Sequence, residues 1–191
     1  MVNNNEDIRE VLFATEVDRV LLRRQRKVVI AGEIDCDTAH NFIVDVSILS
    51  EKSKKPITII ISSNGGSAEY GNSCIRAIRE AQKSGIKVIG SVYGQAMSMA
   101  FFILQACDDR VMGELDTIMA HGLTATSVGD MKNRQAEDKL LKFFQDECSK
   151  LVARRCRKHS FSWWKKLLTD STPKFFSSAE SLELGLVDRI E

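Results

Sequence analysis

The 191-residue sequence has only two prolines and almost no excess of charge of either sign. Its 27 Lys and Arg residues nearly balance 26 Asp and Glu residues, and 11 glycines are spread along the chain. This composition excludes a collagen-like or disordered chain and lacks the strong positive charge typical of nucleic-acid-binding proteins. With 43% hydrophobic residues, the chain is long enough to bury a substantial core. We therefore expect a single domain over residues 1–191.

Paired cysteines, a signal peptide and a membrane span are also missing. The five cysteines are an odd number without a C-x-x-C pair, which argues against a disulfide framework or a zinc site. Residues 1–16 are acidic and lack the basic start and apolar run of a signal peptide. The longest apolar stretch, from Ala96 to Cys107, is far shorter than the roughly 20 residues that span a bilayer. These absences predict a soluble, cytoplasmic protein without a structural metal site or a membrane span.

Short apolar runs alternate with amphipathic segments along the chain. The runs Lys27 to Ala31, Pro56 to Ile61 and Lys87 to Tyr93 are rich in β-branched residues and apolar on both faces, which is typical of buried strands. The other expected elements are a helix beginning at Asp37 or Thr38, a helix over 70–83, a buried helix over 98–107, short strands over 110–112 and 117–120, and a helix ended by Gly185 before a final strand. Repeated β-α units predict an α/β fold.

A segment of different character covers residues 130 to about 158. Its apolar side chains recur on one helical stripe, formed by Leu140, Phe144, Cys148, Leu151 and Val152. A helix of this length exceeds an ordinary crossover between strands, so we expect a projecting helix with Asp130 as its cap. An apolar stripe on a projecting helix needs a partner, which predicts an oligomer.

A basic run extends from Lys150 to Lys166, with seven Lys and Arg residues, no acidic residue, and the pair Trp163 and Trp164. Basic residues beside aromatic ones can bind nucleic acid. In a near-neutral chain we favour a solvated helix end, whose cations complement the helix dipole. A polar interface with a neighbouring subunit is the third interpretation. Nucleic acid is therefore not an expected partner.

Two glycine-bearing turns directly follow predicted strands, S-N-G-G at Ser63–Gly66 and G-Q-A-M-S-M at Gly94–Met99. Each turn delivers backbone N–H groups to the end of a strand, where they can stabilise a negative charge. Ser98 would gain as a nucleophile from such an oxyanion hole, and His121 is a candidate for its general base. A simple turn, an N-cap serine and a core histidine explain the same residues without chemistry.

The order of the motifs distinguishes these interpretations. The chain carries in sequence S-S-N-G-G, G-Q-A-M-S-M-A, I-M-A-H, a long helix, and F-F-S-S-A-E-S-L-E-L-G-L-V-D. This order, from about Leu21 to Glu191, resembles the proteolytic-subunit family of the Clp protease. The resemblance implies a ClpP/crotonase-like α/β fold, a spiral of repeated β-β-α units with a protruding handle helix at about 130–158. It also implies a serine-type endopeptidase that cleaves peptide bonds inside an oligomeric ring.

The resemblance assigns a role to each motif. Ser98 matches the family's nucleophile and His121 its base, while Gly66 and the backbone N–H of Met99 match its oxyanion hole. It further implies a homo-oligomer of stacked heptameric rings, peptide substrates, an AAA+ unfoldase as partner, and no cofactor.

The position of the triad acid departs from the family pattern. The family takes its triad aspartate from an R-D-x-F-like stretch, but residues 171–175 here read S-T-P-K-F, with Pro173 where the aspartate would fall. Asp170 is the nearby candidate for the third triad member, although a solvated turn aspartate is the simpler interpretation. Two alternatives to an active peptidase follow. One is a non-catalytic or weakly active ring subunit, and the other is a crotonase-like acyl-CoA enzyme, whose superfamily shares the fold and a two-turn oxyanion hole.

Overall fold

The computed structural model of the chain describes residues 16–123, 131–170 and 172–191. Its sheet has five strands side by side in the order β1 (Lys27–Ile34), β2 (Ile57–Gly66), β3 (Val88–Met97), β4 (Asp109–Met112) and β7 (Arg189–Ile190), all parallel to their neighbours. The carboxyl end of β3 instead pairs with β5 (Thr117–Ala120), which pairs antiparallel with β6 (Lys174–Phe176). The sheet thus forks at β3, which pairs with β4 along its first half and with β5 at its carboxyl end.

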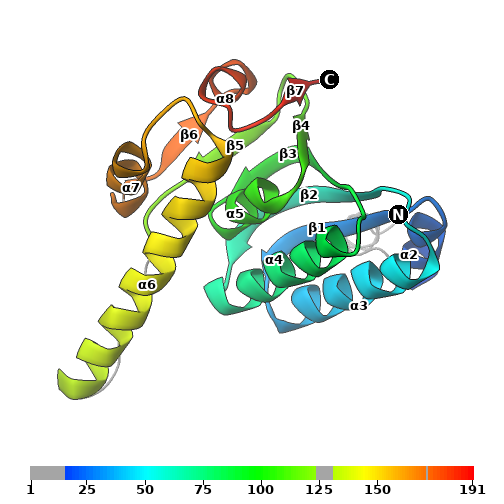
Figure 1. Cartoon of the computed structure of the whole chain (residues 1–191), viewed down its shortest axis with the longest axis horizontal. Coiled ribbons are helices and arrows are strands. Elements are labelled where there is room, and N and C mark those ends of the chain that lie inside the picture. Colours follow the sequence, from blue (N-terminus) through cyan, green and yellow to red (C-terminus); the bar gives the residue numbers. More distant parts are fainter. Residues whose placement is uncertain (1–15, 124–130, 171) are drawn as a thin grey trace, which may run out of the picture.

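Helices follow the first three strands and lie along the sheet (Figure 1). The helices are α2 (Glu16–Arg24), α3 (Cys36–Lys52), α4 (Ala68–Lys83), α5 (Met99–Ala106), α6 (Met131–Arg155), α7 (Phe161–Thr169) and α8 (Ser178–Leu184). The alternation of β1, α3, β2, α4, β3 and α5 confirms the predicted α/β class. All eight residues of α5 are buried, and no helix in the described ranges has the length and apolarity to cross a membrane.

The strands of the sheet bury one face more completely than the other. In β2 the side chains of Ile57, Ile59 and Ile61 are fully buried, whereas Ile60 on the opposite face is only half-buried. The same alternation occurs in β1 and β3. The sequence predicted two buried faces because both are apolar, and this was wrong for the isolated chain: helices α3, α4 and α5 cover one face, and the other is only partly covered.

Side-chain caps set where the helices begin. The carboxylate of Asp35 accepts the backbone N–H of Thr38 at 2.8 Å, so α3 starts at Cys36, slightly before the predicted start. Ser67 caps α4 in the same way, so α4 starts at Ala68, two residues before the predicted start at Tyr70. At the other end of the chain, Gly185 ends α8 in the left-handed conformation, φ 74°, as its position after the apolar residues predicted.

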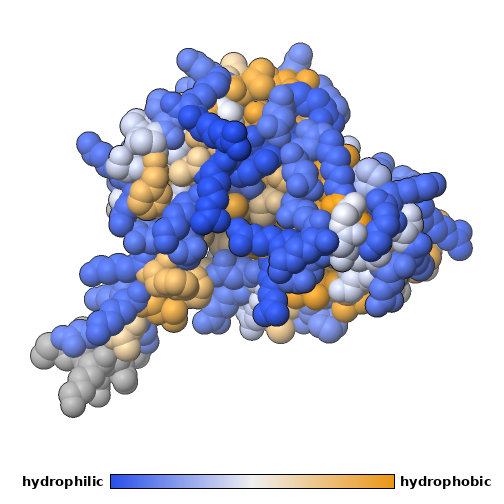
Figure 2. Space-filling view, in the orientation of Figure 1, coloured by the Kyte–Doolittle hydropathy of each residue, from blue (hydrophilic) through white to orange (hydrophobic). Residues whose placement is uncertain are grey.

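The long helix α6 confirms the predicted handle, and it projects from the body of the molecule (Figure 1). The predicted cap Asp130 lies outside the described residues. The apolar stripe divides along the helix: Cys148, Leu151 and Val152 are buried against the body. On the projecting half, Leu140 of the stripe is 50% exposed and Phe144 is half-buried. Phe143, which lies outside the predicted stripe, is 58% exposed, and apolar side chains gather there on the surface (Figure 2).

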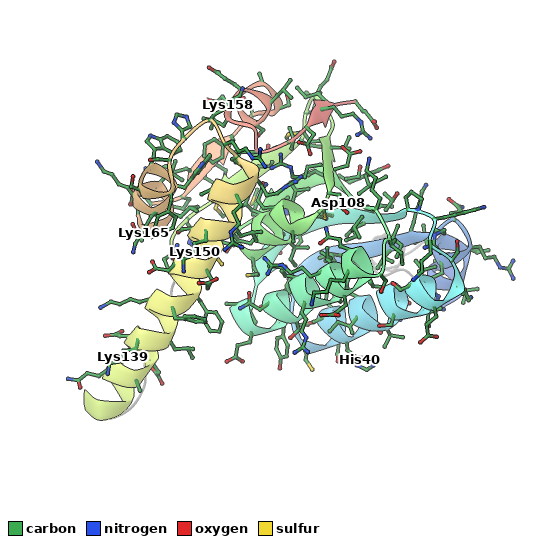
Figure 3. All side chains as sticks on the ribbon, in the orientation of Figure 1. His40, Asp108, Lys139, Lys150, Lys158 and Lys165 are labelled. Carbon is green, nitrogen blue, oxygen red and sulfur yellow. The ribbon has the colours of Figure 1, made fainter. Side chains whose placement is uncertain are left out.

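The basic run does not form a solvated helix end throughout. Ser160 caps a separate helix, α7, which brings Trp164 into the core, where its indole N–H donates to the Cys156 carbonyl at 3.0 Å. Lys165 on α7 pairs with Asp146 on α6 at 2.8 Å (Figure 3). Burying an indole of this size stabilises the fold by about 1.5–3 kcal/mol, which explains one tryptophan of the pair as packing rather than recognition.

Candidate functional site

The fork in the sheet brings the two main candidate residues to neighbouring strand ends. Met97, the last residue of β3, pairs with Met119 of β5, and the backbone N–H of Ser98 donates to the Met119 carbonyl at 2.8 Å. His121 follows directly after β5 ends at Ala120. Ser98 and His121 are both half-buried, so each retains access to solvent or a ligand.

Ser98 has a backbone conformation that serine rarely adopts. Its φ is 53° and its ψ is −118°, and Arg26 is the other non-glycine residue with positive φ in the described part of the chain. Arg26 lies in a turn where its guanidinium donates to several backbone carbonyls, whereas the Ser98 side chain makes no capping hydrogen bond at the start of α5. Such strain costs about 1–3 kcal/mol and is typical of functional turns. The N-cap interpretation of Ser98 is therefore not supported.

The Gly-Gly pair, predicted to follow the strand, forms the last two residues of β2 and packs directly against Ser98. A Cβ atom on Gly65, where φ is 96°, would lie 2.7 Å from the Ser98 Cβ and 3.1 Å from the Met99 backbone nitrogen. Gly66, the residue expected to donate to an oxyanion, has a φ of 152°, and a Cβ there would lie 2.5 Å from the Ile34 carbonyl oxygen. Only glycine fits either position, and the first of the two makes the close approach to the nucleophile candidate.

Met99 starts helix α5 and supplies the second candidate donor. Its backbone N–H belongs to the first turn of the helix, where N–H groups have no acceptor within the helix. The Met99 side chain is buried against Gly71 of α4, where a Cβ would lie 2.2 Å from the Met99 Cγ. This contact anchors the start of α5, so the N–H of Met99 has a fixed direction beside Ser98.

His121 has a hydrogen bond on one ring nitrogen. Its Nδ1 lies 2.6 Å from the backbone carbonyl oxygen of Gly122. A carbonyl oxygen only accepts, so Nδ1 is the donor, and in a neutral ring Nε2 then keeps its lone pair. A neutral histidine in this tautomer has the base nitrogen that a serine nucleophile requires.

The structure places Asp170 near His121 but directs its carboxylate elsewhere. The Asp170 backbone carbonyl accepts the Gly122 N–H at 2.9 Å, while its carboxylate accepts the Thr172 N–H at 2.9 Å and pairs with Lys174 at 3.2 Å. The Thr172 hydrogen bonds, followed by Lys174, hold the pKa of Asp170 below its ordinary value. Within the described residues no carboxylate hydrogen-bonds to His121, and the role of Asp170 stays a prediction.

Two further residues support the site and were missed from the sequence. The carboxylate of Asp116 accepts the N–H of Gly94 at 2.7 Å and that of Gly113 at 2.5 Å, which holds the fork between β4 and β5 against β3. The side-chain oxygen of Gln145, on α6, accepts the Leu123 N–H at 2.7 Å. Neither residue belongs to a motif, because its role depends on contacts between distant parts of the chain.

The residues at this site match the requirements of acyl transfer. A hydroxyl, an imidazole with a free nitrogen, and backbone N–H groups near the hydroxyl are the components of a nucleophile, a base and an oxyanion hole. In the ranges that the structure describes, no three His, Cys, Asp or Glu side chains are grouped to hold a metal ion.

Comparison with known proteins agrees with the order of motifs. The sequence profile of the Clp protease family matches residues 13–191. The chain is 28% identical over 171 residues to the ATP-dependent Clp protease proteolytic subunit 3 of Synechococcus sp. (strain CC9605), covering 87% of this chain and 82% of that protein. The protein of the same name from Parasynechococcus marenigrum (strain WH8102) matches with the same identity and coverage. These matches confirm the resemblance inferred from the sequence.

Proposed function

The chain belongs to the Clp protease family, and on this premise we propose that it is a serine-type endopeptidase with Ser98 as nucleophile and His121 as general base. The Ser98 hydroxyl attacks the carbonyl carbon of the scissile peptide while His121 Nε2 takes its proton. The backbone N–H groups of Met99 and Gly66 hold the oxyanion of the tetrahedral intermediate. The imidazolium then gives its proton to the leaving amine, and water hydrolyses the resulting acyl-Ser98 ester.

The strained backbone of Ser98 is the observation that carries this proposal. A serine that served only to cap α5 would adopt extended backbone angles and accept an N–H with its hydroxyl. Ser98 does neither, and the glycine turn packs against it at the end of β3. The strain holds the hydroxyl at a sharp turn between strand and helix, which is the local geometry in which other hydrolases present a nucleophile.

We also propose that the chain works as a homo-oligomer, with stacked heptameric rings as the arrangement that the resemblance implies. The exposed Leu140 and Phe143 on the projecting half of α6 support an interface there, because large apolar side chains gathered on one exposed helix mark contact sites. The relatives are named as subunits of an ATP-dependent protease, which favours an AAA+ unfoldase as the partner that delivers peptide substrates.

Hydrolysis of a fluorogenic peptide by assembled protein tests the proposed function. We expect Ser98→Ala to lower kcat by about 10³-fold or more, the usual loss when a triad nucleophile is removed, with no change in assembly mass. Ser73→Ala is the matched control, because Ser73 is an exposed serine on α4 whose hydroxyl donates to the Glu69 carbonyl. Equal turnover by wild type and Ser98→Ala would contradict the proposal. An assembled wild type without turnover would instead favour a non-catalytic ring subunit.

A further inference from the structure

The histidine of the candidate site is oriented by a backbone carbonyl in place of a carboxylate. His121 Nδ1 lies 2.6 Å from the Gly122 oxygen, and the Asp170 carboxylate is engaged by Thr172 and Lys174. The Gly122 carbonyl would change direction if its peptide group rotated, unless other contacts hold that group in place. The contacts of the Gly122–Leu123 peptide therefore decide whether His121 keeps its tautomer.

Two hydrogen bonds hold that peptide, and a third holds the peptide before it. The Gly122 carbonyl and the Leu123 N–H belong to one planar trans peptide, so they point in opposite directions. The carbonyl faces His121, and the N–H donates to Gln145 Oε1 at 2.7 Å. On the preceding peptide, the Gly122 N–H donates to the Asp170 carbonyl at 2.9 Å. Rotating the Gly122–Leu123 peptide would break the bonds to His121 and Gln145 together.

Gln145 is placed to hold this peptide in one orientation. It is 7% exposed, and the helix α6 that carries it is packed against the body at this point. Because Leu123 supplies a donor, the side-chain oxygen of Gln145 must face it. The Nε2 group is consequently buried with no hydrogen-bond partner in the described part of the chain. Turning the amide over would set this donor group against the Leu123 N–H and lose their hydrogen bond, so the observed orientation is the favoured one.

We propose that Gln145 is a positioning residue for His121: its side-chain oxygen holds the Leu123 N–H so that the Gly122 carbonyl accepts the Nδ1 proton in place of the missing triad carboxylate. Hydrogen bonds link Gln145 to the 122–123 peptide and that peptide to His121. Hydrogen bonds in such a series polarise one another. A carbonyl carries less charge than a carboxylate, so it selects the tautomer but stabilises the imidazolium less. This inference rests on the proposed function only for its catalytic consequence.

Packing around Gly122 supports a fixed peptide. Gly122 is buried, and a Cβ there would lie 3.1 Å from the Leu168 carbonyl oxygen and 3.2 Å from the Asp170 carbonyl oxygen. The end of α7 therefore confines Gly122 on one side while Gln145 of α6 holds Leu123 on the other. Both helices act on the same two residues after the histidine.

The tautomer of His121 tests the proposal directly, through ¹⁵N NMR of sedimented protein labelled only at histidine. The chain has three histidines, so substituting His40 and His159 singly assigns the His121 signals. At a pH where the ring is neutral, we expect wild-type His121 to carry its proton on Nδ1. Gln145→Met keeps the approximate side-chain volume but removes the acceptor, and we expect a large share of His121 to move to the Nε2–H form. Gln145→Glu keeps an acceptor oxygen and should retain the wild-type tautomer.

Turnover should follow the tautomer in the same variants. We expect Gln145→Met to lower kcat by about 10-fold or more with little change in KM, and Gln145→Glu to restore most of it, because the loss arises from a misplaced proton. If the substitutions acted by unfolding the protein, the kcat of both variants and the assembly mass would fall together. A wild-type His121 protonated on Nε2, or a Gln145→Met protein with the wild-type tautomer, would overturn the proposal. The tautomer measurements do not depend on activity, so they would still test the role of Gln145 if Ser98 were not the nucleophile.

Discussion

The backbone N–H of Ser98 donates to the carbonyl of Met119 at 2.8 Å, across the two strands that end in the candidate nucleophile and the candidate base. The bond continues the ladder between β3 and β5, so strand register sets the relative position of Ser98 and His121. Asp116 strengthens that register by holding Gly94 on β3 and Gly113 before β5. The site is therefore positioned by the sheet rather than by flexible loops, which is the arrangement that keeps reacting groups aligned.

Substitution of Gly65 tests how tightly the turn packs on Ser98. Gly65→Ala places a Cβ 2.7 Å from the Ser98 Cβ and 2.8 Å from the Met97 carbonyl oxygen, at a φ of 96°. We expect peptide hydrolysis to fall by about 100-fold or more, since displacements of about 1 Å near reacting groups have effects of this size. The measurement is kcat/KM on a fluorogenic peptide, together with the melting temperature.

Gly85→Ala is the matched control for this substitution. Gly85 also has positive φ, 82°, but no atom lies within 4 Å of its added Cβ. The Gly85→Ala protein should therefore lose about 1 kcal/mol of stability from backbone strain and keep its activity. If Gly65→Ala were as active as Gly85→Ala, the close contact between the turn and Ser98 would have no role in catalysis.

The Asp170→Asn substitution separates the two candidates for orienting His121. The Asp170 carboxylate is bound by Thr172 and Lys174, whereas its backbone carbonyl, which the substitution keeps, accepts the Gly122 N–H. We expect turnover to stay within about 3-fold of wild type, because only a lost triad acid costs several orders of magnitude. A loss near 10⁴-fold with unchanged assembly mass would assign the third triad position to Asp170 and contradict the role given to the Gly122 carbonyl.

The projecting half of α6 is the expected contact surface of the oligomer. Leu140→Glu combined with Phe143→Glu would put two charges into an apolar interface, and we expect the assembly to divide into smaller species. Lys139→Glu is the control, because it changes a charge on the same projecting part of the helix, at a side chain that is already exposed (Figure 3). Light scattering at micromolar protein measures the masses. A monomeric wild type would contradict an oligomer altogether.

The sequence predicted the elements whose signals are local. Apolar runs closed by glycine or serine gave β1, β2 and β3, and the long periodic segment gave α6 to within a few residues. It did not predict α7 or β6. Helix α7 begins at Ser160 in the middle of the basic run, and its stability comes from burying Trp164 against the rest of the core. A three-residue strand such as β6 depends on its antiparallel neighbour β5 rather than on its own residues.

The residues of the candidate site also fall into those with a local sequence signal and those that depend on tertiary contacts. Ser98, His121, Gly66 and Met99 were proposed from the sequence because each lies in an ordered motif, and their chemical roles stay predictions. Gly65 lies in the same turn, yet its approach to Ser98 depends on how β2 and β3 pair. Gln145 carries no local signal, because a glutamine on a polar helix is normally a surface residue. Its role follows only from the packing of α6 beside residues 122 and 123.

Labelling with a fluorophosphonate probe tests the central claim most directly, because the probe forms a phosphonyl ester only with an activated serine and releases fluoride. The assembled wild type should take up one probe per chain, and mass spectrometry of its peptides should locate the adduct on Ser98. Ser98→Ala should take up none, while Ser73→Ala should label like wild type. Labelling at another serine, or no labelling of a preparation that cleaves peptides, would contradict Ser98 as the nucleophile.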